Sequence, residues 1–173
     1  MEHAKHEAHS GRGGHAEVNH YGRLLAMLGL SFACMYALMY AMVDRFANVV
    51  PNINQFYMAA LMTAPMAILE LALMGAMYQD KRKNAVIFAL AGLVLIGSWF
   101  GIRTQTGVGD RQFLKSMIPH HAGAILMCKE AKISSSEIQA LCRSIIEGQQ
   151  AEISRMKSLL DEARSQPREA DRQ

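Results

Sequence analysis

This sequence has little net charge and lacks the common catalytic motifs. The formal net charge is only +3, and the basic residues cluster near the ends of apolar segments rather than along one face. We therefore predict no nucleic-acid-binding surface. The sequence contains no P-loop, no Rossmann glycine pattern and no Ser–His–Asp set, so we expect no enzymatic activity.

Charged side chains are also nearly absent from three long apolar stretches, at about 23–43, 55–78 and 84–102, and the one charge well inside them is Glu70. A helix needs about 20 apolar residues to cross the hydrocarbon core of a bilayer. A helix in a soluble protein would show a polar stripe, and these stretches show none. We predict an all-α membrane protein with three spans over residues 23–103, surrounded by membrane lipid.

No small-residue cleavage site of a signal peptide follows the first apolar stretch, so we expect that span to be an uncleaved anchor. Residues 1–22 are polar and rich in glycine and histidine, which predicts a disordered tail that either collects metal or is only a solvated low-complexity segment. Its histidines are His3, His6, His9, His15 and His20. We expect residues 166–173 to form a second disordered end.

Lysine and arginine are distributed unevenly between the two sides of the predicted membrane domain. Three spans place the tail and the turn at 79–83 on one side, which holds Lys5, Arg12, Arg23, Lys81, Arg82 and Lys83. The other side holds Arg45, Arg103 and Arg111 close to the membrane. The positive-inside rule assigns the first side to the cytoplasm. The C-terminal part is then periplasmic, and the spans lie in the inner membrane of a bacterium.

Residues 104–165 have the pattern of two amphipathic helices joined by a short turn. We predict that Asp110 caps the first helix and that Pro119, which has no N–H to donate, kinks or restarts it. Ser134 and Glu137 fit a capping box at the start of the second helix. One hairpin cannot bury both of its apolar faces. We therefore predict a homo-oligomer in which two hairpins complete a four-helix bundle.

Soft metal ligands are concentrated in this predicted hairpin. They are Met117, His120, His121, Met127 and Cys128 on the first helix, with Cys142 and Met156 on the second. Met117, His121 and Cys128 are spaced so that they share one helical face. Thioether, thiolate and imidazole groups together favour Cu(I), or Ag(I) in its place, over harder ions.

The expected register of the hairpin brings these side chains together. If the turn centres near Ser135, Cys128 and Cys142 lie at similar height, and His121 lies level with Gln149. The two cysteines can then pair with each other or share a metal. The hairpin has no Glu-x-x-His, CxxC or HxxxH spacing, which argues against a di-iron or a structural zinc site. Each methionine also has a simpler interpretation, as filling of the hairpin core.

Two runs, Phe113–Met127 and Ile145–Ile153 followed by Met156, resemble the signature of the "domain of unknown function 305" family. The most specific part is Met-Ile-Pro-His-His at 117–121. That family includes periplasmic copper-binding proteins and has a ferritin-like helical bundle. The resemblance implies copper or silver binding through Met117, His120, His121, Met127 and Met156. This chain has only one hairpin, half of such a bundle, and it carries Cys128 and Cys142 where the family commonly has alanine.

A second set of soft side chains lies in the predicted membrane domain. The second span carries Met58, Met62, Met66, Glu70 and Met74 at every fourth position. The third span carries Gly97 and Gly101 as a GxxxG pair, which permits close helix packing. These features and the His-rich tail resemble the eukaryotic copper-transporter family, although the charge rule gives the opposite orientation. The methionines also suit ordinary helix packing, whereas an ionisable Glu70 at membrane depth is costly and marks a pathway or a helix–helix hydrogen bond.

Together these patterns favour a non-enzymatic, membrane-anchored protein that captures or buffers Cu(I) in the periplasm, as part of copper resistance or homeostasis. One alternative is a copper transporter or channel subunit, in which the methionines of the second span and Glu70 pass the ion across the membrane. Another is a scaffold that recruits a copper-export protein.

Overall fold

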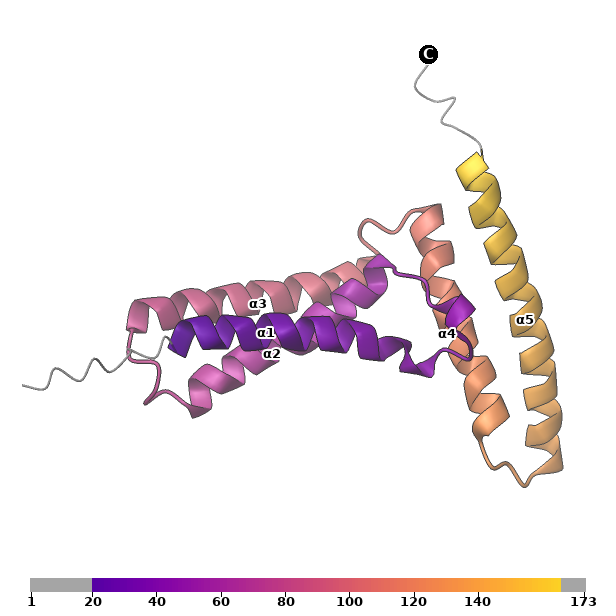
Figure 1. The fold of residues 1–173 in the computed structure, drawn as a ribbon, viewed down its shortest axis with the longest axis horizontal. Coiled ribbons are helices and arrows are strands. Elements are labelled where there is room, and N and C mark those ends of the chain that lie inside the picture. The colour runs from indigo at the N-terminus through magenta and orange to yellow at the C-terminus, as the bar shows by residue number, and fades with distance from the viewer. Residues whose placement is uncertain (1–19, 166–173) are drawn as a thin grey trace, which may run out of the picture.

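The computed structural model describes residues 20–165 and contains helices and no strand within that range (Figure 1). The elements are α1 (His20–Leu38), η1 (Met39–Met42), η2 (Phe46–Asn48), α2 (Ile53–Leu73), α3 (Lys81–Thr104), α4 (Asp110–Glu130) and α5 (Ser136–Ser165). The all-α prediction is confirmed. The expected disordered ends lie mostly outside the described residues. At the N-terminal end the boundary differs, because residues 20–22 form the start of α1.

Three helical stretches are long and apolar enough to cross a membrane, namely α1 with η1, α2, and α3. Their outer surfaces are covered with large apolar side chains: Leu30, Leu73 and Leu93 are 68%, 81% and 67% exposed. A continuous apolar surface of this kind is a liability in water and suits contact with lipid. In Figure 1, α1, α2 and α3 run side by side, and α2 packs against both of the others. The prediction of a membrane protein with three candidate spans is confirmed.

The second span is shorter than the sequence pattern predicts. α2 ends at Leu73 rather than near 78, and Met74 is its C-cap. The turn that follows is fixed by Asp80, whose Oδ1 accepts from the backbone N–H groups of Arg82 and Lys83 and so starts α3 at Lys81. The N–H of Lys83 is the main reason why the pKa of Asp80 lies below its ordinary value. Because α2 ends at Leu73, the repeat of Met58, Met62, Met66, Glu70 and Met74 is helical only as far as Glu70.

The hairpin helices also differ from the prediction at their ends. α4 runs without interruption through Pro119, so the helix does not restart there, and its N-cap is Gly109 rather than Asp110. α5 begins at Ser136, so Ser134 lies in the turn and is one residue too early to be the N-cap. Ser135 therefore caps α5 in its place, with its Oγ accepting from Ile138 N–H at 3.4 Å.

The α4–α5 hairpin lies across the end of the membrane domain where α1 finishes and α2 begins. α4 lies next to the membrane domain, and α5 lies beyond α4 (Figure 1). Its core consists of Ile118, Ala122 and Ile125 from α4 with Ile153, Met156 and Leu160 from α5. Val43 and Val50, from the α1–α2 connection, pack against this core. A Cβ at Gly123 would lie 3.4 Å from the Met42 carbonyl oxygen, so α4 approaches this connection closely.

The α1–α2 connection thus covers apolar surface that the sequence pattern assigns to a second copy. Apolar side chains farther along the hairpin, including Ile138 and Leu141, stay about half exposed. Burial of these by a second hairpin stays a prediction.

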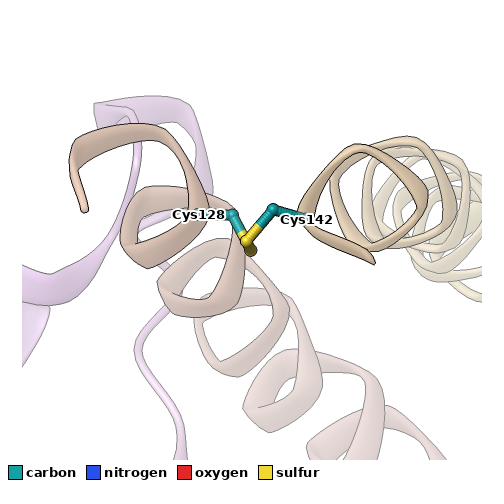
Figure 2. Close-up of a disulfide and its surroundings, with 2 residues drawn as sticks. All are labelled: Cys128 and Cys142. Atoms are coloured by element: carbon teal, nitrogen blue, oxygen red, sulfur yellow. A yellow bond between two sulfur atoms is a disulfide. The ribbon is translucent and has the colours of Figure 1, made fainter. Parts of the chain in front are cut away.

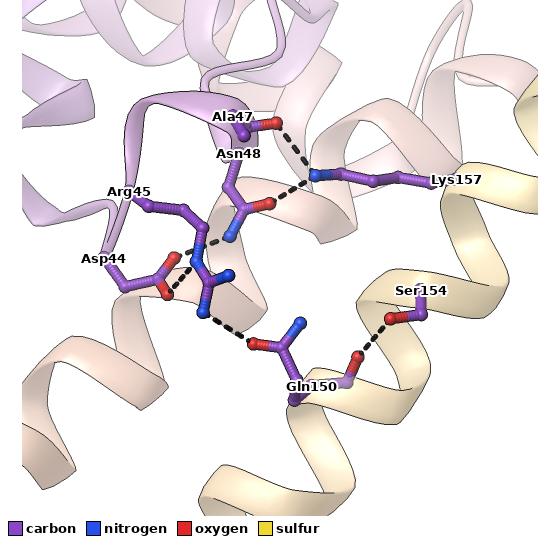
Figure 3. A network of polar contacts seen from close by, with 7 residues as sticks. All are labelled: Asp44, Arg45, Ala47, Asn48, Gln150, Ser154 and Lys157. Carbon is purple, nitrogen blue, oxygen red and sulfur yellow. Dashed lines mark hydrogen bonds and ion pairs between the residues drawn. The ribbon is translucent and has the colours of Figure 1, made fainter.

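Polar contacts also fix the far helix α5 to the α1–α2 connection (Figure 3). The Lys157 Nζ donates to the Ala47 carbonyl at 2.9 Å and to Asn48 Oδ1 at 2.6 Å. The Arg45 guanidinium donates to Gln150 Oε1 at 3.0 Å. Asp44, whose side chain is only 2% exposed, accepts from Asn48 and Arg45 and so orders the connection. Hydrogen bonds therefore attach α5 to the α1–α2 connection, in addition to the apolar contacts of the hairpin core with Val43 and Val50.

Candidate metal centre

A disulfide joins the two hairpin helices near their turn (Figure 2). Cys128 on α4 and Cys142 on α5 are bonded, with their Cα atoms 5.2 Å apart. This confirms that the two residues lie at similar height on facing helices. Of the two alternatives left open by the sequence, a shared metal or a disulfide, the structure has the disulfide. In this form neither sulfur is a thiolate, so the pair offers no thiolate ligand.

Three of the sequence-predicted ligands line one pocket between α4 and α5. The pocket has a volume of about 210 Å³, and its walls include Met117, His121 and Met156. Glu152, Arg155 and Phe113 also line this pocket. Two thioethers and one imidazole therefore converge from two helices on a single space.

The imidazole of His121 lies against an acidic side chain of the facing helix. Its Nδ1 is 2.9 Å from Glu152 Oε2, and the His121 side chain is only 14% exposed. The contact has the length of an ion pair, but it is not aligned as a hydrogen bond, and Nδ1 has no hydrogen-bond partner. Glu152 is more than half exposed. The sequence-predicted neighbour of His121 was Gln149, and the observed partner lies about one helical turn farther along α5.

Hydrogen bonds to the membrane domain hold the first part of α4 in place. The Ser116 Oγ donates to Asn52 Oδ1 at 3.2 Å, and Ile53 N–H donates to Gln112 Oε1 at 3.3 Å. Both bonds lie in the turns of α4 just before Met117 and so fix the part of the helix that leads to it. On α5, Met156 belongs to the buried hairpin core while also lining the pocket. The methionines thus pack as core residues and still present their sulfur-bearing side chains to the pocket, so the two sequence interpretations are compatible.

Two other predicted ligands lie outside this pocket. His120 is exposed, and its ring centroid is 6.2 Å from that of His121. Met127 is 55% exposed and lies two turns beyond His120 on α4. Among residues 20–165, no group of three or more His, Cys, Asp and Glu side chains has the geometry of a metal site. A site in the hairpin therefore depends on the thioethers of Met117 and Met156.

Glu152 and Arg155 were not singled out by the sequence analysis. A usable signal was available: Glu152 precedes Met156 by four residues, so the two share a face of α5. That spacing alone is common in helices, and only the fold identifies the facing residue as His121.

The methionine row of the second span does not line a common interior path in one chain. Met58 and Met62 lie on the outer surface of α2, and Met74 lies beyond its end. Met66 is half-buried. Glu70 lies three residues from the end of α2 rather than at mid-span, and its Oε1 accepts from the Tyr78 hydroxyl at 3.1 Å.

The two glycines of the GxxxG pair have different surroundings. A Cβ at Gly101 would lie 3.0 Å from the Tyr57 ring, so this glycine permits the close approach of α2 and α3. A Cβ at Gly97 would meet nothing within 4 Å. Gly97 instead borders an apolar groove of about 530 Å³ between the spans.

The fold and the pocket define a helical membrane protein with soft ligands gathered in an appended hairpin. The family model described as "Domain of unknown function (DUF305)" matches residues 102–167, and the chain belongs to this family. "Uncharacterized protein L153" of Acanthamoeba polyphaga mimivirus is 33% identical over 146 residues, which are 83% of this chain and 94% of that protein. This alignment is longer than the hairpin, so the likeness includes part of the membrane domain. No solved structure matches the chain.

Proposed function

We propose that this protein is a membrane-anchored, non-enzymatic binder of Cu(I), for which Ag(I) is a chemical substitute. The ion is held in the hairpin pocket by Met117, His121 and Met156. The observation that supports this proposal is the convergence of two thioethers and one imidazole on a single pocket. This soft ligand set favours Cu(I) and Ag(I) and is a poor match for Mg²⁺, Ca²⁺ or Mn²⁺.

Glu152 is a positioning residue in this proposal. A carboxylate beside one ring nitrogen keeps the proton of neutral histidine on that nitrogen and leaves the other as a ligand. Glu152 is next to Nδ1 of His121, so Nε2 is the nitrogen that binds the metal. The carboxylate also supplies a negative charge near the bound cation.

The disulfide supports a location of the hairpin outside the cytoplasm. Structural disulfides persist in oxidising compartments such as the bacterial periplasm and are rare in the cytosol. The distribution of lysine and arginine independently assigns the hairpin to the same side. In this proposal the spans lie in the inner membrane of a bacterium, and the hairpin captures and buffers copper in the periplasm as a contribution to copper resistance.

The proposal is tested by titrating full-length protein in detergent with Cu(I) against a competing chelator. Met117→Leu, Met156→Leu and His121→Ala should each weaken binding at the hairpin. Met127→Leu and His120→Ala are matched controls because their side chains lie outside the pocket, and they should bind as the unsubstituted protein does. Equal losses in all five variants, or no loss in the first three, would contradict the proposal.

A further inference from the structure

A second pocket with soft and polar walls lies at the opposite end of the membrane domain. Its volume is about 400 Å³. It is formed by the start of α1, the end of α2 and the turn before α3. Its walls include His20, Arg23, Met27, Glu70, Met77 and Tyr78. The hairpin packs at the other end of α2, so the two pockets are separated by the length of a span.

The walls of this second pocket are fixed by contacts between distant parts of the chain. The Tyr21 hydroxyl donates to Asn84 Oδ1 at 2.8 Å and accepts from the Asp80 N–H at 3.0 Å. The rings of Tyr21 and Tyr78 pack with their centroids 5.3 Å apart. Tyr78 is buried in a cluster against which Met27 also packs. These contacts bring α1 and the turn before α3 together around the end of α2.

The residue types of this pocket resemble those of the hairpin pocket: two methionines, one histidine and one glutamate line each of them. Met27 and Met77 bring two thioethers, and His20 brings an imidazole. Glu70 brings a carboxylate, which is held at one oxygen by the Tyr78 hydroxyl and has its second oxygen free of any hydrogen bond in residues 20–165. Two soft sulfur ligands select a soft ion, and the negative charge of Glu70 attracts a cation.

We propose that this pocket is a second binding site for a soft monovalent metal ion, Cu(I) or Ag(I), on the side of the membrane opposite the hairpin. Met27 and Met77 are its thioether ligands, with His20 as the imidazole ligand and Glu70 as the compensating charge. Arg23 also lines the pocket and is exposed, and its positive charge acts on the neighbouring Tyr78. The site uses none of the hairpin residues, so it does not depend on the function proposed above.

The position of the pocket gives it a different role from that of the hairpin. His20 is both the first residue of α1 and the last histidine of the His-rich segment. The pocket is therefore continuous in sequence with four further histidines at positions 3, 6, 9 and 15.

The test is an Ag(I) titration of the full-length protein in detergent, with His3, His6, His9, His15 and the free Cys34 changed to Ala so that they bind no metal. In this background we expect two equivalents of Ag(I) per chain. Adding Met117→Leu, His121→Ala and Met156→Leu should remove one equivalent and leave the other. Adding Met27→Leu and Met77→Leu to that protein should remove the second equivalent as well.

Met35→Leu with Met39→Leu is the matched control, because it makes the same two changes on α1 away from the second pocket, and it should leave the remaining equivalent in place. Circular dichroism and gel filtration confirm that each variant is folded. If the hairpin-silenced protein binds no Ag(I), or if its remaining equivalent survives Met27→Leu with Met77→Leu, the second site is wrong. Failure of the hairpin proposal has a different result: silencing the hairpin residues then removes no equivalent.

Discussion

Removing the Cys128–Cys142 disulfide should loosen the turn end of the hairpin and leave its base in place. The bridge spans a sequence separation of 14, for which the chain-entropy model gives about 3 kcal/mol of stabilisation at 25 °C. The buried core runs from Ile118 to Ile125 on α4 and from Ile153 to Leu160 on α5, away from the turn. Near the turn, Ile138 and Leu141 are half exposed. Few apolar contacts there compensate for loss of the bridge.

Amide hydrogen exchange of the full-length protein measures this effect. In the Cys128→Ala, Cys142→Ala variant, a loss of about 3 kcal/mol corresponds to a roughly hundredfold increase in opening for amides near the turn. Amides in the buried core of α4 and α5 should change much less. Cys34→Ala is the matched control, because Cys34 is a free cysteine on α1. Unchanged protection near the turn, or equal loss along the whole hairpin, would refute this reasoning.

Three further predictions concern the attachment of the hairpin and the packing of the spans. Burial raises the pKa of Asp44, but hydrogen bonds from Asn48 and Arg45 outweigh burial and lower the pKa below its ordinary value. Its stabilising contribution is therefore complete above the unfolded pKa of about 3.9 and is lost as the pH falls through the lower folded pKa. The unfolding temperature measured across acid pH should show this loss. Asp44→Asn should remove the part of that pH dependence that comes from Asp44. Lys157→Met removes two hydrogen bonds, one of them to the buried Asn48, and should lower the free energy of unfolding by about 1–3 kcal/mol. Denaturant titration measures this free energy, and Lys132→Met, at an exposed lysine, is the control. Equal stability of the two variants would contradict the assigned contacts. Gly101→Ala places a Cβ against the Tyr57 ring, which is held by a hydrogen bond to the Thr106 carbonyl, and should destabilise the protein by about 1–3 kcal/mol. Gly97→Ala meets no atom within 4 Å and should be neutral in thermal unfolding, so similar effects of the two changes would show that the packing is wrongly assigned.

The fold followed from the sequence wherever one strong physical signal dominated. The three apolar stretches are long enough to span a bilayer, and no soluble packing would tolerate their surfaces. The hairpin register was also predictable, because the helical rise relates Cys128 and Cys142 once the turn position is known. Helix ends were less predictable, since Ser134 and Ser135 are both competent caps and only the structure shows that α5 begins at Ser136.

The sites were only partly predictable, because they depend on contacts between segments distant in sequence. Periodicity placed Met117, His121 and Cys128 on one face of α4, apart from His120 and Met127, but it did not show which of these faces lines a pocket. The burial of the hairpin core by Val43 and Val50 was missed, because a short connection between spans carries no periodic signal. The second pocket was missed for the same reason: its methionines come from α1 and from a turn, and only folding brings them to Glu70.

The most direct test of the hairpin site is ¹⁵N NMR of the histidine side chains in full-length protein during addition of Ag(I). The account predicts that Nε2 of His121 shifts on binding while Nδ1 keeps its proton, and that Glu152→Gln weakens binding by about 10–100-fold. The ¹⁵N resonances of the neighbouring His120 ring should not shift. Binding of Ag(I) with no change at His121, or with equal changes at His120 and His121, would contradict the account.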